Sequence, residues 1–367
     1  LLSTCFLCAY PLISNAAPQG GMIINGQAAI ENNGALTTIN QSTQNATIEW
    51  QSFNVGQTET VNFIQPSSNS TTLNRINNQN PSEILGSIQS NGRVFLSNPN
   101  GFIFSESSTV NTASFLATSS DITSFDDDYI MLDSHGAGGI TNNGTLSASD
   151  KGFVALFAPQ ITNSGSINSP NGEIVLSNKN QGTLFLNNMA GIGIAIDSLD
   201  SINPVGIENS GVLIASGGRI LLDSDALDST LKNAINNSGI INASSIQQDG
   251  GNIRLIANSG SIYQTGLLQA DAMNIGNGGE IQLIASNALI SQGEISAQGG
   301  LLSGDGGFIE TSGHESIELN TRIFTNAANG QSGHWLIDPN SITVGDAVGT
   351  DFTSAQIITS LSTNGTV

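Results

Sequence analysis

The chain has 367 residues, of which only 10% are charged, and its formal net charge is −21. An ordinary domain is about one quarter charged. Here Asn, Ser, Thr and Gly, including 42 glycines, take the place of charged residues, and these types disfavour helix interiors. We therefore expect an all-β protein. The 8 basic residues against 29 acidic ones cannot form a basic patch, which argues against binding to nucleic acid or to an anionic membrane.

The first 16 residues have the pattern of a secretory signal peptide. An apolar run ends in Ser14-Asn15-Ala16, a small-x-small cleavage pattern, and the run is too short to span a bilayer. Because it has neither a starting Met nor a basic segment, we expect residues 1–16 to be an N-terminally incomplete signal peptide. Both cysteines, Cys5 and Cys8, lie within it, so the mature chain is expected to contain no disulfide.

Residues 20–122 repeat little and contain a series of sharp motifs. Asn98-Pro99-Asn100-Gly101 is a turn by its chemistry, because Pro presets φ and Gly accepts a positive φ. Trp50 and Phe53 are expected to fill the core or to cap it near the first rungs. The motifs occur in this order: Ile48-Glu49-Trp50, Ser52-Phe53-Asn54-Val55-Gly56, Val61-Asn62-Phe63-Ile64, Leu73-Asn74-Arg75-Ile76, Asn80-Pro81-Ser82, Asn91-Gly92 and Asn98-Pro99-Asn100-Gly101.

From about residue 140 the sequence repeats a two-part pattern, I-x-N-x-G-x-[IL]-x-A and then G-G-x-I-x-L-x-A. Repeats of this length indicate a stacked architecture. The interval between Ile174 and Ile220 contains GTLFLNNMAGIGIAIDS, which we interpret as an additional rung. Helix is expected only near Ala226–Ala234. The second-strand anchors are taken as Phe153, Ile174, Ile220, Ile253, Ile281 and Phe308.

Each repeat contains short alternating segments separated by Gly and Asn, so one set of side chains points inward and the other outward. Repeats with two or three strands per turn coil naturally, with equivalent residues stacked about 4.8 Å apart. We therefore predict a right-handed, single-stranded parallel β-helix of about 12 to 16 rungs, with Ile253, Leu255, Ile281 and Leu283 pointing inward. Propellers and sandwiches explain the Gly-Gly-x-Ile-x-Leu recurrence less well.

The ordered motifs resemble the two-partner-secretion domain of filamentous-haemagglutinin-like exoproteins, which carry an N-terminal haemagglutination activity domain. Phe102 departs from this family, which has a smaller aliphatic residue there. The resemblance implies a secretion domain at 17–125 that caps the N-terminal rungs, between the expected signal peptide at 1–16 and continuing β-helix repeats at 126–367. Because the last residues, STNGTV, end without a capping feature, we expect these repeats to be truncated at the C-terminus.

The same resemblance implies how the protein is exported and what it binds. It implies export through the Sec machinery and then an outer-membrane Omp85-type transporter with POTRA domains, and a location outside a Gram-negative cell or on its surface. The whole protein is expected to be a monomeric adhesin or haemagglutinin that binds a host-cell or bacterial-surface receptor or glycan. The stalk of a contact-dependent inhibition toxin remains an alternative.

The resemblance also supplies the candidate site residues. The turn at residues 98–101 has two interpretations, a corner needed for folding or a direct contact with the transporter, and the loop from Asn77 to Pro81 carries the same ambiguity. For Arg75, an ion pair with a nearby Glu is preferred over a ligand contact. The candidates are Asn74, Arg75, Asn80, Pro81, Asn98, Pro99, Asn100 and Gly101.

No catalytic, cofactor or metal site is expected. His135, His314 and His334 lack metal-ligand spacing, and Asp126-Asp127-Asp128 lacks the alternating ligand pattern of a calcium loop. Parallel β-helices include polysaccharide-degrading enzymes, the less favoured alternative, but such enzymes need clustered carboxylates, whereas the acidic residues here are spread thinly. We therefore expect a protein that is not an enzyme.

Overall fold

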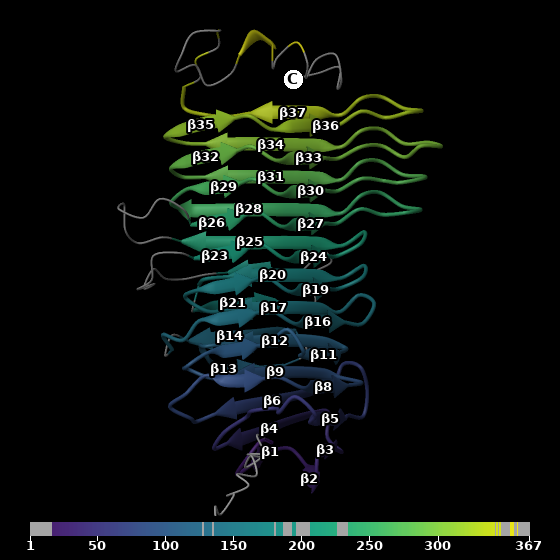
Figure 1. Cartoon of the computed structure of the whole chain (residues 1–367). Helices are drawn as coiled ribbons and strands as arrows, with labels where there is room; N and C mark the ends of the chain where they lie inside the picture. Colours follow the sequence, from purple (N-terminus) through teal and green to yellow (C-terminus); the bar gives the residue numbers. More distant parts are fainter. Residues whose placement is uncertain are drawn as a thin grey trace, which may run out of the picture.

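A computed structural model shows an elongated stack of short strands, from β1 and β2 at one end to β35, β36 and β37 at the other (Figure 1). It describes residues 17–126, 128–133, 136–179, 181–185, 193–195, 206–225, 234–341, 343, 345, 353–355 and 358. The expected signal peptide, His135 and the expected helix at 226–233 lie outside these residues. Among the residues described, no helix has the length and apolarity to cross a bilayer.

Three parallel sheets form the walls of the stack, and their strands follow one another along the chain. Sheet 1 contains β1 (Met22–Asn25), β4 (Asn45–Trp50), β6 (Thr71–Ile76), β9 (Arg93–Ser97), β12 (Ser114–Thr118), β17 (Phe153–Phe157), β20 (Glu173–Ser177), β25 (Arg219–Asp225), β28 (Asn252–Ser259), β31 (Glu280–Ala285), β34 (Phe308–Gly313) and β37 (His334–Ile337). Sheet 2 contains β2 (Ala28–Asn33), β3 (Leu36–Gln41), β5 (Thr60–Ile64), β8 (Ser87–Ser90), β11 (Thr109–Thr112), β16 (Thr145–Ala148), β19 (Ser166–Asn168), β24 (Val212–Ile214), β27 (Ile240–Asn242), β30 (Leu267–Gln269), β33 (Glu294–Ser296) and β36 (Arg322–Phe324). Sheet 3 contains β7 (Ser82–Ile84), β10 (Phe102–Phe104), β15 (Ile140–Asn142), β18 (Ile161–Asn163), β23 (Ile207–Asn209), β26 (Ile235–Asn237), β29 (Ile262–Gln264), β32 (Ala288–Ser291) and β35 (Ser316–Leu319).

One rung passes from sheet 2 to sheet 1 to sheet 3, as β16, β17 and β18 do, and then starts again in sheet 2 with β19. Equivalent strands of successive rungs pair in parallel. The first end is different, because β1 pairs with β4 and β2 pairs with β3 in the antiparallel direction. The chain is therefore a parallel β-helix, as the repeats predict, and antiparallel strands close its N-terminal end.

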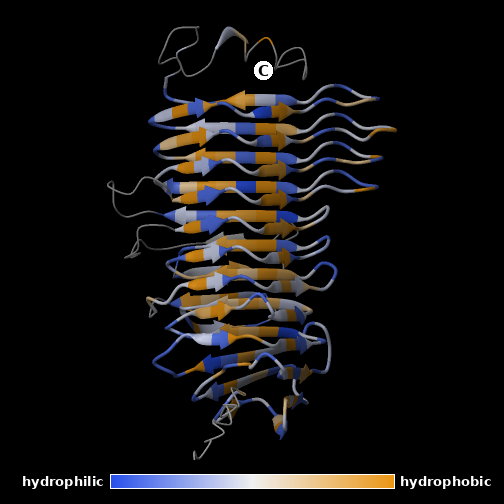
Figure 2. Cartoon of the chain, viewed as in Figure 1, coloured by the Kyte–Doolittle hydropathy of each residue, from blue (hydrophilic) through white to orange (hydrophobic). Residues whose placement is uncertain are grey.

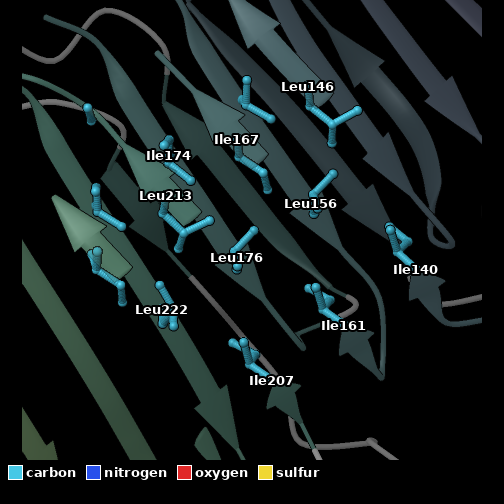
Figure 3. Packing of buried hydrophobic residues seen from close by; sticks show 14 of the residues in the cluster. Ile140, Leu146, Leu156, Ile161, Ile167, Ile174, Leu176, Ile207, Leu213 and Leu222 are labelled. Atoms are coloured by element: carbon cyan, nitrogen blue, oxygen red, sulfur yellow. The ribbon is translucent and has the colours of Figure 1, made fainter. Parts of the chain in front are cut away.

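Branched aliphatic side chains fill the interior in columns, and hydrophobic residues recur at matching places on successive strands (Figures 2 and 3). In sheet 3, Ile140 stacks on Ile161 and Ile161 on Ile207. The predicted inward residues are all fully buried: Ile253, Leu255, Ile281 and Leu283.

Two of the predicted anchors are wrong by one residue. Val154, not Phe153, pairs with Ile174, and Ile309, not Phe308, pairs with Ile281. Because successive strand residues point to opposite faces, Phe153 lies on the outer face of sheet 1, where it belongs to a second hydrophobic cluster. The error arose because the phenylalanine directly after the glycine was aligned with the inward isoleucines of the other repeats. In these two repeats the inward residue is the next one along the chain.

The additional rung expected between Ile174 and Ile220 is also wrong. These two residues are direct partners, because β20 pairs with β25. Sheet 1 has twelve strands, of which all but β1 stack in parallel, so the described residues form fewer rungs than the predicted 12 to 16. The intervening segment instead contributes to a fourth sheet outside the helix.

This fourth sheet, called here the outer sheet, is antiparallel and contains β13 (Asp121–Phe125), β14 (Tyr129–Asp133), β21 (Gly182–Phe185) and β22 (Gly193–Ala195). Its inward side chains Ile122, Ile130 and Leu184 pack against outward side chains of sheet 1. The cluster between the two sheets also contains Leu73, Phe95, Leu116, Leu132, Phe153, Ala155, Phe157 and Val175. The outer sheet therefore binds rungs together from outside the helix.

Candidate functional site

The Asn98–Gly101 turn lies at the corner where the chain passes from sheet 1 to sheet 3, between β9 and β10. The loop 77–81 occupies the same corner of the preceding rung, and residues 136–139 occupy that of the following rung. Hydrogen bonds connect all three: Asn100 Nδ2 donates to the Asn78 carbonyl at 2.6 Å, and Gly138 N donates to the Pro99 carbonyl at 3.0 Å. We call these three segments the 98–101 corner.

The Asn98 side chain holds this corner together from inside. It is fully buried, and its Nδ2 donates to the Asn80 carbonyl at 3.2 Å and to Ser82 Oγ at 3.0 Å. Its Oδ1 accepts the Asn100 N–H at 3.0 Å, and its carbonyl accepts the Gly101 N–H at 2.8 Å. The amide group is therefore committed to internal partners, as in an Asx-turn.

Pro99 and Asn100 are half-buried at the surface of this turn. Gly101 has a φ of +85°, and a Cβ there would lie 2.0 Å from the Gly139 carbonyl oxygen. Only glycine avoids both the strained φ and the clash. This turn therefore depends on close contact with the next rung as well as on its own sequence.

The other candidates are divided among three places. Asn80 and Pro81 are exposed on the 77–81 loop and belong to the corner. Asn74 lies in the interior of the helix, where its Oδ1 accepts the Trp50 Nε1–H at 2.9 Å. Trp50 and Phe53 are buried in an edge-to-face pair with centroids 5.5 Å apart, which confirms their expected place in the first rungs.

Arg75 points outward to the outer sheet. Its Nη2 donates to the Ile122 carbonyl at 2.6 Å, and its Nε lies 3.6 Å from Asp121 Oδ1. The ion pair is thus made with an aspartate, not with the expected glutamate, because β13 rather than a neighbouring rung covers this part of sheet 1. Arg75 joins the helix to the outer sheet and does not belong to the corner.

Sequence reasoning missed the glycines of the following rung, Gly136 and Gly138. A Cβ at Gly138 would lie 2.0 Å from the Asn100 carbonyl carbon, and one at Gly136 would lie 2.6 Å from the Pro99 carbonyl oxygen. The signal that could have identified them is the glycine cluster Gly136-Ala137-Gly138-Gly139 just before an inward isoleucine.

Two carboxyl groups on later rungs have perturbed protonation. Burial raises the pKa of Asp271, although its Oδ1 accepts hydrogen bonds from Gln298 N at 2.7 Å and Ser296 Oγ at 2.6 Å. Burial also raises the pKa of Asp223, although Lys179 Nζ lies 3.0 Å from its Oδ2. Neither group lies at the 98–101 corner.

Within the described part of the chain, no three His, Cys, Asp or Glu side chains are grouped to hold a metal ion. His314 and His334 are exposed, and His314 Nε2 lies 3.2 Å from Asn340 Nδ2. Asp126 Oδ1 accepts the N–H groups of Asp128 and Tyr129 and so closes the β13–β14 turn. The 98–101 corner is a folded surface that backbone and side-chain amide hydrogen bonds hold together.

Comparison with known proteins identifies the family. The family model of the TPS secretion domain matches residues 14–283. The chain belongs to this family. It is 30% identical over 257 residues to a heme/hemopexin-binding protein of Haemophilus influenzae (strain ATCC 51907 / DSM 11121 / KW20 / Rd), covering 65% of the chain and 27% of that protein. It is 37% identical over 123 residues to a second heme/hemopexin-binding protein of Haemophilus influenzae, covering 33% of the chain and 13% of that protein.

Among solved structures, the HMW1 secretion domain from Haemophilus influenzae matches with a TM-score of 0.62 and 23% identity, covering 88% of this chain and all of that one. The chain therefore has the same fold as the HMW1 secretion domain. The chain spans about a quarter or less of the length of the two curated relatives.

Membership confirms the resemblance read from the motifs. TPS exoproteins are secreted from Gram-negative bacteria to the outside or the cell surface, and the TPS domain implies an outer-membrane transporter as partner. Residue 125, where the secretion domain was expected to end, is the last residue of β13. All three sheets of the helix contain strands both before and after this residue.

Proposed function

We propose that this chain directs the export of a larger surface protein. The Sec machinery moves it to the periplasm, after which an Omp85-type transporter with POTRA domains passes it through the outer membrane. In this proposal residues 1–16 are the signal peptide, 17–125 contain the export determinant, and 126–367 extend the β-helix. The protein is a monomer and is not an enzyme.

We assign the 98–101 corner a role in folding the first rungs. The observation that supports this is the complete burial of Asn98, with its amide hydrogen-bonded to Asn80, Ser82 and Asn100. The folded corner encloses this side chain, so a transporter could contact it only before the corner has folded. Because each rung contacts mainly its neighbours, a β-helix can fold progressively as it emerges, and a folded first rung opposes backward movement.

The test replaces Asn98 and Asn100 with Ala and keeps Pro99 and Gly101, so that the backbone can still turn. If the corner acts through folding, the double variant loses about 2 kcal/mol from its lost hydrogen bonds, and export falls in step with stability. Normal stability with accumulation in the periplasm would contradict this and would favour direct recognition by the transporter.

The chain contains a matched control turn, Ser169-Pro170-Asn171-Gly172, in which Gly172 N donates to the Ser169 carbonyl at 3.1 Å. Asn171 has a φ of 49°, so Asn171→Ala also destabilises a turn, but in a later rung and at the corner between sheets 2 and 1. We expect export to fall less in this variant than in the double variant at equal loss of stability.

For the surface role of the whole protein we propose adhesion to a receptor or glycan. A second role, binding of haem or a haem-carrying protein, is favoured by the names of the two curated relatives. Binding of the full-length protein to host cells, compared with its binding to haem-loaded hemopexin, separates the two roles. A toxin domain encoded downstream in the same gene would instead support the stalk of a contact-dependent inhibition toxin.

A further inference from the structure

A buried group of three charged side chains lies on the outer face of sheet 1, away from the 98–101 corner. Lys179 follows β20, and Asp223 and Asp225 lie in β25 of the next rung. Lys179 Nζ is 3.0 Å from Asp223 Oδ2 and 3.7 Å from Asp225 Oδ2. The three side chains are only 9–11% exposed, in contrast to the ion pair Arg322–Glu294, in which the arginine is 76% exposed.

Neighbouring amides hold this group in place. Asn178 donates from Nδ2 to the Asp225 carbonyl at 2.7 Å and accepts the Asp225 N–H at Oδ1 at 2.9 Å, which fixes the end of β25 against the end of β20. Asn258 Nδ2 of β28 donates to Asp223 Oδ1 at 2.9 Å. The carboxyl carbon of Asp223 is thus held beside an amine by three successive rungs.

An ammonium group and a carboxylate do not condense as ions, because the ammonium nitrogen has no free electron pair and the carboxylate carbon has no adequate leaving group. Fixed proximity replaces the entropy cost of bringing the two groups together, and burial disfavours the charged form of a carboxyl group. Burial raises the pKa of Asp223, which favours the protonated acid that an amine can attack. Asp225, the second carboxylate within reach of Lys179, can accept the proton that the lysine must lose.

We propose that Lys179 and Asp223 form an intramolecular amide cross-link, with Asp225 as the proton acceptor. Lys179 transfers one proton to Asp225, and the neutral amine attacks Cγ of protonated Asp223. The new C–N bond forms, the C–O bond to the hydroxyl breaks, and a second amine proton leaves with that hydroxyl as water. Asp225 then returns its proton to solvent, so that the only product besides the amide is one water molecule.

The place of the cross-link suggests its purpose. It would join the rung of β20 to the rung of β25 at the base of the excursion that carries β21 and β22. Both cysteines of the chain, Cys5 and Cys8, precede the described residues, so a disulfide between these rungs is not available. A closed loop would obstruct an unfolded chain in a pore, and the reaction requires groups that only the folded rungs bring together, so the cross-link is expected to form after folding.

The test is the mass of the folded protein after denaturation. We expect the wild type to be lighter by one water molecule than its sequence requires, and proteolysis to yield a branched peptide that joins Lys179 to Asp223. Lys179→Arg retains a cation in the same place but cannot form this amide, so it should have the full mass. Asp225→Asn should also have the full mass, because the proton acceptor is lost while both reacting groups remain.

Arg322→Lys is the matched control for proximity alone. It places a lysine beside Glu294 across neighbouring rungs in an exposed ion pair, and it should lose no water beyond that lost by the wild type. A wild-type protein of full mass would show that the group is an ion pair only and would overturn the proposal. A loss of water that persists in Lys179→Arg would overturn it as well, and a branch at Asp225 would overturn the assigned roles.

Discussion

The first rungs and the later rungs of this β-helix are stabilised in different ways. Up to β12, large aromatic side chains fill the interior, and buried glutamine side chains bond to backbone carbonyls of their own rung and of the next. Gln41 Nε2, for example, donates to the carbonyls of Thr43, Gln44 and Thr71. The fully buried aromatic residues inside these rungs are Trp50, Phe53, Phe63, Phe102, Phe104 and Phe115.

In the later rungs the same two kinds of contact recur from rung to rung. Branched aliphatic columns run through all three sheets (Figure 3), and a ladder of buried amides runs along sheet 3. In this ladder each side-chain Nδ2 donates at 2.7 Å to the side-chain oxygen of the next rung, through Asn142, Asn163, Asn209, Asn237 and Gln264. The aromatic contacts of the first rungs therefore differ from one rung to the next, whereas the aliphatic and amide contacts of the later rungs repeat. This explains why the first region is recognised by its motifs and the second by its period.

The largest expected effect tests the interior of the repeated region. Leu283→Asp places an unpaired carboxylate where Leu283 is fully buried, and we expect the free energy of unfolding to fall by about 4 kcal/mol or more. The neighbouring Gln282→Asp, on the outer face beside Glu310, should cost less than about 1 kcal/mol. Chemical denaturation measures both, and equal losses would contradict the assigned faces.

The next effect tests whether the amide ladder stabilises the later rungs or only fills space. Asn209→Leu leaves the Nδ2 donor of Asn163 and the Oδ1 acceptor of Asn237 without their ladder partner, at an expected cost of about 2–4 kcal/mol. Glu208→Gln, at the exposed neighbouring position, should change the free energy of unfolding little. A neutral or stabilising Asn209→Leu would show that the aliphatic columns alone stabilise these rungs.

Two buried tryptophans compare the two regions directly. The Trp50 Nε1–H donates to Asn74 Oδ1 at 2.9 Å in the first rungs, and the Trp335 Nε1–H donates to Thr311 Oγ1 at 3.0 Å in the last strand of sheet 1. We expect Trp50→Phe and Trp335→Phe each to cost about 1–2 kcal/mol. Export should fall only for Trp50→Phe, as measured by the fraction of protein outside the cell. Equal loss of export in both variants would remove the special role of the first rungs.

The sequence predicted what depends on period and failed where distant segments meet. The Gly-Gly-x-Ile-x-Leu spacing placed Ile253 and Ile281 correctly, because alternation alone fixes which face a strand residue occupies. It did not predict the outer sheet, whose strands come from two excursions between rungs. The Asp121 partner of Arg75 was missed for this reason, and Phe153 was misplaced because nothing in its repeat shows that an outer sheet covers it.

The candidate site shows the same limit. Turn chemistry predicted the bend at residues 98–101, because Pro99 and Gly101 restrict the backbone locally. The burial of Asn98 depends on the Asn80 carbonyl and Ser82 in the preceding rung and on the glycines 136–139 in the following rung. No local pattern links these segments. Only the stacking of three rungs shows that the amide is enclosed.

The smallest expected effect concerns pH and a loop of the repeated region. Burial raises the pKa of Asp271 in the folded state, and the neighbouring Glu294 adds to this rise. The contribution of Asp271 to the free energy of unfolding is therefore fully present at pH values below 3.8, its ordinary pKa. This contribution is lost as the pH rises through the folded-state pKa of Asp271. Asp271→Asn keeps an oxygen for the hydrogen bonds from Ser296 and Gln298 and does not ionise. We expect the variant to gain stability relative to wild type between pH 4 and pH 7, as measured by denaturation at both values. A difference between the two proteins that does not change with pH would mean that the carboxylate is adequately solvated, and that the repeated loops, unlike the interior columns, tolerate charge.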